Sequence, residues 1–75
     1  MPASKPSRAP EHGHRVAQAR KRAGLTQQQL AEKVGVNRVS IARVEAGSRA
    51  PSMALALRIA EVLEESVENL FGGGR

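Results

Sequence analysis

The sequence predicts an all-α fold, a compact domain of five helices. Apolar residues recur three and four positions apart, no segment alternates as a β-strand does, and glycine or proline stands between the periodic stretches. The 75 residues suffice for one small domain, and with no cysteine and a single Phe its core must be aliphatic. We expect the domain at residues 13–71, after a disordered basic, proline-rich arm at 1–12 and before a flexible tail at 72–75.

The first helix is expected from about His14 to Ala23, because Gly24 then ends the apolar periodicity. Its thin apolar stripe consists of Val16, Ala19 and Ala23. Its basic residues Arg15, Lys21 and Arg22 are expected to face water or phosphate. After the glycine, Leu25 should pack inward.

The second helix is expected to begin after Thr26, whose side chain can form a capping box with Gln29. Its inward face consists of Leu30, Ala31 and Val34. Gly35 can take the left-handed conformation that ends a helix, and Asn37 is a good N-cap for the next one. These signals predict two short helices joined by a tight turn.

The third helix, at about residues 37–45, has two chemically different sides. Ile41 and Val44 should point into the core. The outward side consists of Arg38, Val39, Ala42 and Arg43. Arginine can bind guanine through two hydrogen bonds, and a small apolar group can touch the methyl of thymine. This helix therefore suits the DNA major groove.

The C-terminal part predicts two more helices. Gly47 is a natural C-cap, and Pro51 stands where the fourth helix, at about residues 52–64, begins. Its predicted core stripe is Met53, Ala56, Leu57, Ala60 and Leu63, with Ile59 at the margin. Ser66 should cap a short last helix that carries Val67, Leu70 and Phe71.

The formal charge of +5 is unevenly distributed along the chain. Residues 1–49 hold ten Lys and Arg and three Glu, a charge of +7, whereas residues 50–75 hold two Arg and four Glu, a charge of −2. A polyanion is the obvious partner of the basic half, although a solvated surface would also explain the charge. No apolar run reaches membrane-spanning length and no secretion signal is evident, so we expect a cytoplasmic protein without membrane contact.

Catalysis and metal binding are not expected. No Ser, His or acidic residues stand in a pattern suited to nucleophilic chemistry, and no glycine-rich phosphate loop follows a strand. His12 and His14 are two apart, whereas helical metal pairs need a spacing of three or four. We expect no enzyme, no cofactor and no metal.

The stretch LTQQQLAEKVGVNRVSIARVEAGSRAPSMALALRIAEVL resembles the helix-turn-helix domain of phage repressors and Cro, the XRE-type regulators. The matching residues are Gln27, Leu30, Ala31, Gly35, Ile41, Glu45, Gly47 and Pro51. The likeness extends over roughly residues 14–71 and implies a lambda-repressor-like fold. One departure is Glu64-Glu65, where family sequences often have glycine and an apolar residue.

The resemblance also implies residue roles. A structural ion pair is expected between Arg20 and Glu45. Base contacts are expected from Arg38, Val39 and Arg43; the alternatives are phosphate contact alone for the two arginines and a partly buried helix position for Val39. Gln27 is expected to contact a phosphate, and Asn37 and Ser40 a phosphate or a base at the edge of the site. Independently of the resemblance, the exposed backbone N–H groups of the loop with Ser48 and Arg49 would suit a second phosphate, unless the loop is a plain connector. In the arm, Lys5 and Arg8 could reach phosphates or a minor groove, and a terminus without a role is the alternative.

Together these features predict a sequence-specific regulator of transcription that binds double-stranded DNA as a homodimer on a palindromic operator. Val67, Leu70 and Phe71 are the candidate dimer surface, unless they complete the core. The alternative is a helix-turn-helix module for protein interaction, an antitoxin or scaffold that binds DNA weakly or not at all. RNA polymerase or a cognate toxin would be a further partner.

Overall fold

The structure, a computed structural model, describes residues 11–72, and the side chains of residues 13–72. It contains five helices, which are α1 (Glu11–Arg22), α2 (Gln27–Val34), α3 (Arg38–Ala46), α4 (Met53–Leu63) and α5 (Val67–Phe71). No strand occurs among these residues, and the expected all-α class is confirmed. Residues 1–10 of the expected arm, with Lys5 and Arg8, and residues 73–75 of the expected tail lie outside the described part.

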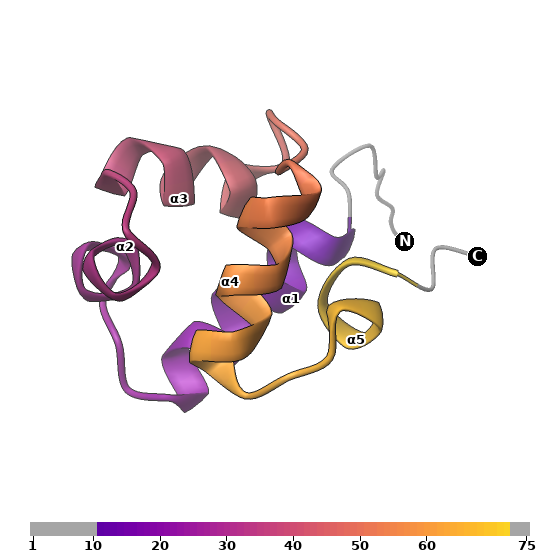
Figure 1. Ribbon diagram of the computed structural model, residues 1–75, viewed down its shortest axis with the longest axis horizontal. Helices are drawn as coiled ribbons and strands as arrows, with labels where there is room; N and C mark the ends of the chain where they lie inside the picture. The colour runs from indigo at the N-terminus through magenta and orange to yellow at the C-terminus, as the bar shows by residue number, and fades with distance from the viewer. Residues whose placement is uncertain (1–10, 73–75) are drawn as a thin grey trace, which may run out of the picture.

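The helices surround one aliphatic core, and α3 lies at its edge (Figure 1). Helix α4 crosses in front of α1, α2 is seen end-on beneath one end of α3, and α5 lies beside α4. Helix α1 packs on α3 and α5, while α2 packs on α3 and α4. The largest fully buried side chains are Leu30, Ile41, Ile59, Leu70, Val16 and Val34. Because α3 is held from one side only, its other side is left open to a partner.

The caps agree with the local sequence signals. Thr26 and Gln29 form the expected capping box of α2, and the Asn37 side chain accepts a hydrogen bond from the Ser40 backbone N–H at the start of α3. Gly35 and Gly47, the C-caps of α2 and α3, have φ angles of 95° and 77°. L side chains rarely adopt these values, so glycine is favoured both in the turn between α2 and α3 and where the chain leaves α3.

Helix α1 begins at Glu11, three residues before the expected start, and therefore includes the last two residues assigned to the arm. Gly13 lies inside the helix, where a Cβ atom would be only 2.7 Å from the carbonyl oxygens of Val44 and Glu45. This glycine lets α1 approach the end of α3 closely. At its other end the helix stops at Arg22, so Ala23 is exposed in a turn and is not part of the apolar stripe.

The predicted core face of α4 is wrong at its margin. Met53 and Leu57 are 68% and 51% exposed, whereas Ile59 is fully buried. The buried face consists of Ala56, Ile59, Ala60 and Leu63. The apolar stripe of α4 is wider than the face that α2 and α5 can cover. Periodicity locates such a stripe, but only its neighbours decide which edge of it is buried.

Helix α5 packs on the core, which removes Leu70 from the expected dimer surface. Leu70 is only 2% exposed, while Val67 and Phe71 are half-buried against the core. Leu70 therefore offers no surface to a second copy. Arg15, expected to face water or phosphate, instead donates hydrogen bonds from Nη1 to the carbonyl oxygens of Asn69 (3.1 Å) and Gly72 (3.0 Å). It holds the C-terminal end of α5 against α1.

Glu64, which stands where family sequences often have glycine, adopts the left-handed backbone conformation that a glycine would adopt in the turn after α4. Glu64 is the C-cap and is the only non-glycine residue with positive φ, 57°, in the described part of the chain. A left-handed conformation costs a residue with a Cβ atom about 1–2 kcal/mol. Helices α4 and α5, which this turn joins, pack against each other.

Candidate nucleic-acid interface

The outward side of α3 is the candidate contact surface. Ile41 and Val44 are buried beneath it, while Arg38 and Arg43 are exposed and Val39 is 46% exposed. The side chains that were expected to face a partner thus do point into solvent. Helix α3 thus packs on the core through two aliphatic side chains and exposes two guanidinium groups to solvent.

A buried ion pair fixes the orientation of α3 relative to α1. Arg20 on α1 contacts Glu45 on α3 through two hydrogen bonds, Nε–Oε2 at 2.6 Å and Nη2–Oε1 at 3.1 Å. The two side chains are only 11% and 7% exposed. Arg20 also donates from Nη1 to the carbonyl oxygen of Leu25 at 2.8 Å. This single guanidinium therefore ties together α1, the turn before α2 and the end of α3.

Gln27 links that ion pair to the exposed surface. Its Nε2 donates to Glu45 Oε1 at 2.9 Å, and its Oε1 accepts from Arg38 Nη1 at 3.4 Å. Because the amide nitrogen must face the carboxylate, the amide oxygen faces Arg38. The orientation of Arg38 is thus coupled, through Gln27 and Glu45, to Arg20 in the interior.

Arg58 is a supporting residue that the sequence analysis missed. Its Nε donates to the carbonyl oxygen of Val34 at 2.8 Å, which caps the C-terminal end of α2 at the turn into α3. A cation at a helix C-terminus also interacts favourably with the helix dipole. The donor lies 24 residues after its acceptor. No local pattern in the sequence could have identified it.

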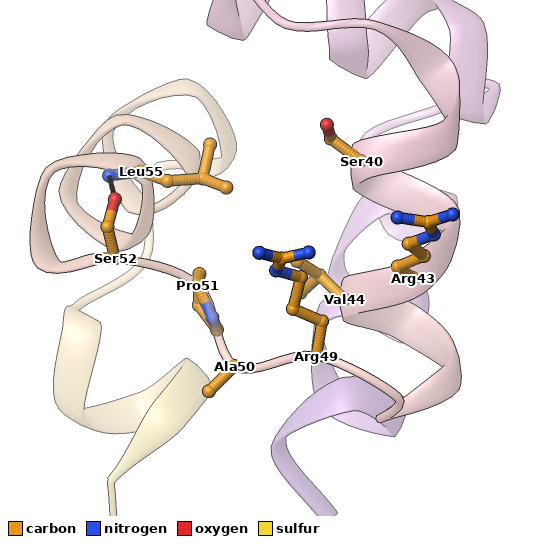
Figure 2. A pocket seen from close by; sticks show the side chains of 8 residues that line it. All are labelled: Ser40, Arg43, Val44, Arg49, Ala50, Pro51, Ser52 and Leu55. Carbon is orange, nitrogen blue, oxygen red and sulfur yellow. Dashed lines mark hydrogen bonds between the residues drawn. The ribbon is translucent and has the colours of Figure 1, made fainter.

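A groove between α3 and the start of α4 extends the surface (Figure 2). It has a volume of about 550 Å³ and is lined by Ser40, Arg43, Val44, Arg49, Ala50, Pro51, Ser52 and Leu55. The Arg49 side chain reaches from the loop between the two helices, and Arg43 extends from α3. No carboxylate lines the groove, so its two guanidinium groups favour an anion.

The remaining expected phosphate contacts lie around this surface. Asn37 and Ser48 are exposed, and Ser40 is half-buried. Asn37 Oδ1 accepts the capping hydrogen bond from Ser40 N at 2.9 Å, and Ser48 Oγ donates to the carbonyl oxygen of Arg43 at 3.3 Å. Both side chains therefore stabilise the ends of α3 in the free protein.

The fold also sorts the charges of the basic half. Arg38, Arg43 and Arg49 lie at or beside α3, where no exposed carboxylate lines the groove. Arg22 and Lys33 instead share a second groove, of about 430 Å³, with Glu64 and Glu65. Charges of both signs meet in this second groove, whereas the groove beside α3 is lined by arginines without a carboxylate.

Residues 11–72 contain no group of three His, Cys, Asp or Glu side chains that could hold a metal ion. Within this range no helix is both long and apolar enough to cross a membrane. The candidate surface at α3 consists of arginines, small polar side chains and helix ends.

Comparison with known proteins points to the same family. A family model described as helix-turn-helix matches residues 16–70. An uncharacterized HTH-type transcriptional regulator from Methanothermobacter thermautotrophicus is 47% identical over 57 residues, which cover 75% of this chain and 83% of the relative. Its name is that of a regulator, not of an enzyme.

Two solved structures share the fold. The restriction-modification controller protein C.AhdI from Aeromonas hydrophila has a TM-score of 0.77 and 33% identity, covering 81% of this chain and 92% of its own. The P22 c2 repressor, solved in complex with a synthetic operator, has a TM-score of 0.78 and 28% identity, covering 83% and 96%. The chain therefore has a lambda-repressor-like fold and belongs to the helix-turn-helix family of XRE/Cro-type transcriptional regulators.

Proposed function

We propose that this protein is a sequence-specific regulator that binds double-stranded DNA as a homodimer, with α3 in the major groove. The observation that carries the proposal is the outward side of α3, on which Arg38, Val39 and Arg43 are exposed. The Arg20–Glu45 ion pair holds the inner side of the same helix against α1. A rigid helix with two exposed arginines has the shape and the donors that the major groove accepts. The operator complex of the P22 c2 repressor supports DNA as the partner.

In this arrangement the contacts divide by position. Arg38, Val39 and Arg43 read base edges, and Gln27, Asn37, Ser40, Ser48 and Arg49 contact phosphates on either side. The N-terminal end of α2 and the groove beside α4 would lie against the two strands that flank the major groove. Phosphate contacts fix the register of the helix, and base contacts select the sequence. Bound in this way, the protein would repress by blocking RNA polymerase or activate by contacting it.

The homodimer follows from the small size of one recognition surface. One domain reads only a few base pairs, too few for useful selection in a genome. Two copies related by a two-fold axis, with recognition helices about 34 Å apart, double the site on a palindromic operator. We assign the dimer contact to the exposed α4 side chains Met53 and Leu57, which lie four residues apart on one face, together with the half-buried Val67 and Phe71. These apolar groups would lose contact with water in a dimer.

Leu57→Glu tests this surface. The side chain is 51% exposed, so a carboxylate there is not forced into the core and the monomer should still fold. Across a two-fold contact it places two like charges together, and we expect the dimer to weaken by at least tenfold in sedimentation equilibrium. Arg22, an exposed residue at the end of α1, supplies the control, because Arg22→Ala should dimerise normally. A dimer unaffected by Leu57→Glu would rule out the α4 face.

The DNA partner is tested by titrating the full chain against random duplex at two salt concentrations. We expect affinity to fall steeply as salt rises, with a log–log slope of about −0.9 for each phosphate neutralised. Little binding at either concentration would contradict the proposal. It would favour the alternative, a scaffold or antitoxin that binds a protein such as a cognate toxin. The groove with Arg22, Lys33, Glu64 and Glu65 is a surface that such a partner could use.

A further inference from the structure

The outward side of α3 has a definite chemical pattern around the helix, with an apolar centre between two arginines. At 3.6 residues per turn, Arg38 and Arg43 are about 140° apart around the helix, and Val39 and Ala42 fall between them. Arg38, Val39 and Arg43 are exposed, and Ala42 is half-buried. The centre of the surface therefore offers methyl groups, and only its two margins offer hydrogen-bond donors.

We infer that each half of the operator presents two G·C pairs with at least one T·A pair between them. Arg38 and Arg43 bind the two guanines, and Val39 packs on the thymine methyl between them. This inference rests on the proposed function and specifies the bases that the same surface reads. The arginines at the margins of the outward side select bases by hydrogen bonding, whereas Val39 at its centre selects them by apolar contact.

At the margins the spacing fits the stacking of base pairs. Five residues of α-helix rise about 7.5 Å, which is about two steps of 3.4 Å along the duplex. Because both arginine side chains are long, the distance between their guanidinium groups can differ from this by about one base-pair step. The guanines are therefore expected to be separated by one or two base pairs. Guanine is the base whose O6 and N7 acceptors match the two parallel donors of a guanidinium.

Arg38 is the better oriented of the two. Gln27 Oε1 accepts from its Nη1 at 3.4 Å, and Gln27 is itself held by Glu45 at 2.9 Å. A guanidinium has five N–H donors, so a single long contact biases its direction and leaves a pair of donors for a base. Because part of the ordering has taken place before DNA binds, the guanine preference should be stronger at the Arg38 position than at the Arg43 position.

At the centre of the outward side of α3, Val39 disfavours base pairs other than T·A. Its side chain has no hydrogen-bonding group and is 46% exposed. The thymine methyl is the only apolar group that a base pair presents in the major groove. Any polar base edge opposite Val39 would lose its water without gaining a partner, which is unfavourable. A T·A pair is therefore preferred beneath the middle of the helix.

The test is selection of bound duplexes from a random pool, performed with the full chain and with two variants. For the unchanged protein we expect half-sites with two G·C pairs flanking T·A. Arg38→Ala should abolish the preference at one G·C position only, and Val39→Ser should abolish the T·A preference while both G·C positions persist. In a selected site, changing either G·C pair to A·T should weaken binding about 5- to 150-fold.

The possible failures are distinguishable. Enriched half-sites without guanine at the outer positions, or a pattern unchanged in Arg38→Ala, would overturn the inference and leave DNA binding intact. Salt-dependent binding without enrichment of any sequence would overturn both the inference and the sequence specificity of the proposed function, because it would assign both arginines to phosphates and leave DNA binding alone. Absence of binding to every pool at low salt would instead overturn the proposed function. Arg22→Ala is the matched control and should select the same sites as the unchanged protein.

Discussion

Replacing Arg20 with alanine is expected to lower the free energy of unfolding by about 3–5 kcal/mol. The change leaves the Glu45 carboxylate, which is 7% exposed, without its guanidinium partner, and it also removes the donor to the Leu25 carbonyl. Such a loss is a large part of the 5–15 kcal/mol that typically stabilises a domain. Urea unfolding followed by circular dichroism measures it.

Arg22→Ala is the matched control for this change. Arg22 lies on the same helix, two residues further on, and is exposed, so its removal should cost well under 1 kcal/mol. Arg20→Lys should fall between the two variants, since an ammonium cannot form the two-pronged contact that Nε and Nη2 make with Glu45. Equal losses for Arg20→Ala and Arg22→Ala would mean that the ion pair contributes little to stability.

Arg43→Ala and Arg49→Ala are expected to weaken DNA binding in different ways. Arg43 extends from the outward side of α3, so its loss should relax the choice of base at one operator position by about 1–3 kcal/mol. Arg49 extends from the loop into the groove beside α4, so its loss should weaken binding to all sequences alike and reduce the salt slope by about one. Fluorescence titrations against the selected site and single-base variants, at several salt concentrations, separate the two effects.

The opposite result is equally informative. If Arg49→Ala changed base preference while Arg43→Ala weakened all sequences equally, the groove would read bases and α3 would contact phosphates. Both arginines are exposed, so neither change should alter the unfolding curve. Arg22→Ala, which removes a positive charge beside Glu64 and Glu65, controls for the general effect of net charge.

Much of the fold can be predicted because its signals are local. Thr26, Asn37 and Ser66 each stand where a helix starts, and Gly35 and Gly47 stand where one ends. A cap depends on residues three or four positions away, so a short window of sequence contains the relevant chemistry. The outward position of Arg38 and Arg43 follows in the same way from the inward Ile41 and Val44 on the same helix.

Errors arose where contacts join residues distant in the sequence. Arg58 caps α2 from α4, and Arg15 holds α5 from 54 and 57 residues away. Gly13 allows α1 to approach the carbonyl groups of α3. None of these pairs has a spacing that a pattern search would recognise.

The sequence by itself determined the number and order of the helices, the N-cap and C-cap residues of α2 and α3, and the residues of the outward face of α3, because each depends on neighbours within one or two helical turns. Only the tertiary structure decided that Leu70 belongs to the core, that Met53 and Leu57 remain exposed, and that Gln27 connects Arg38 to the buried ion pair. Burial depends on which helix covers which face. That is settled by the packing of the whole chain, since an apolar stripe wider than its neighbours can cover leaves one edge in water.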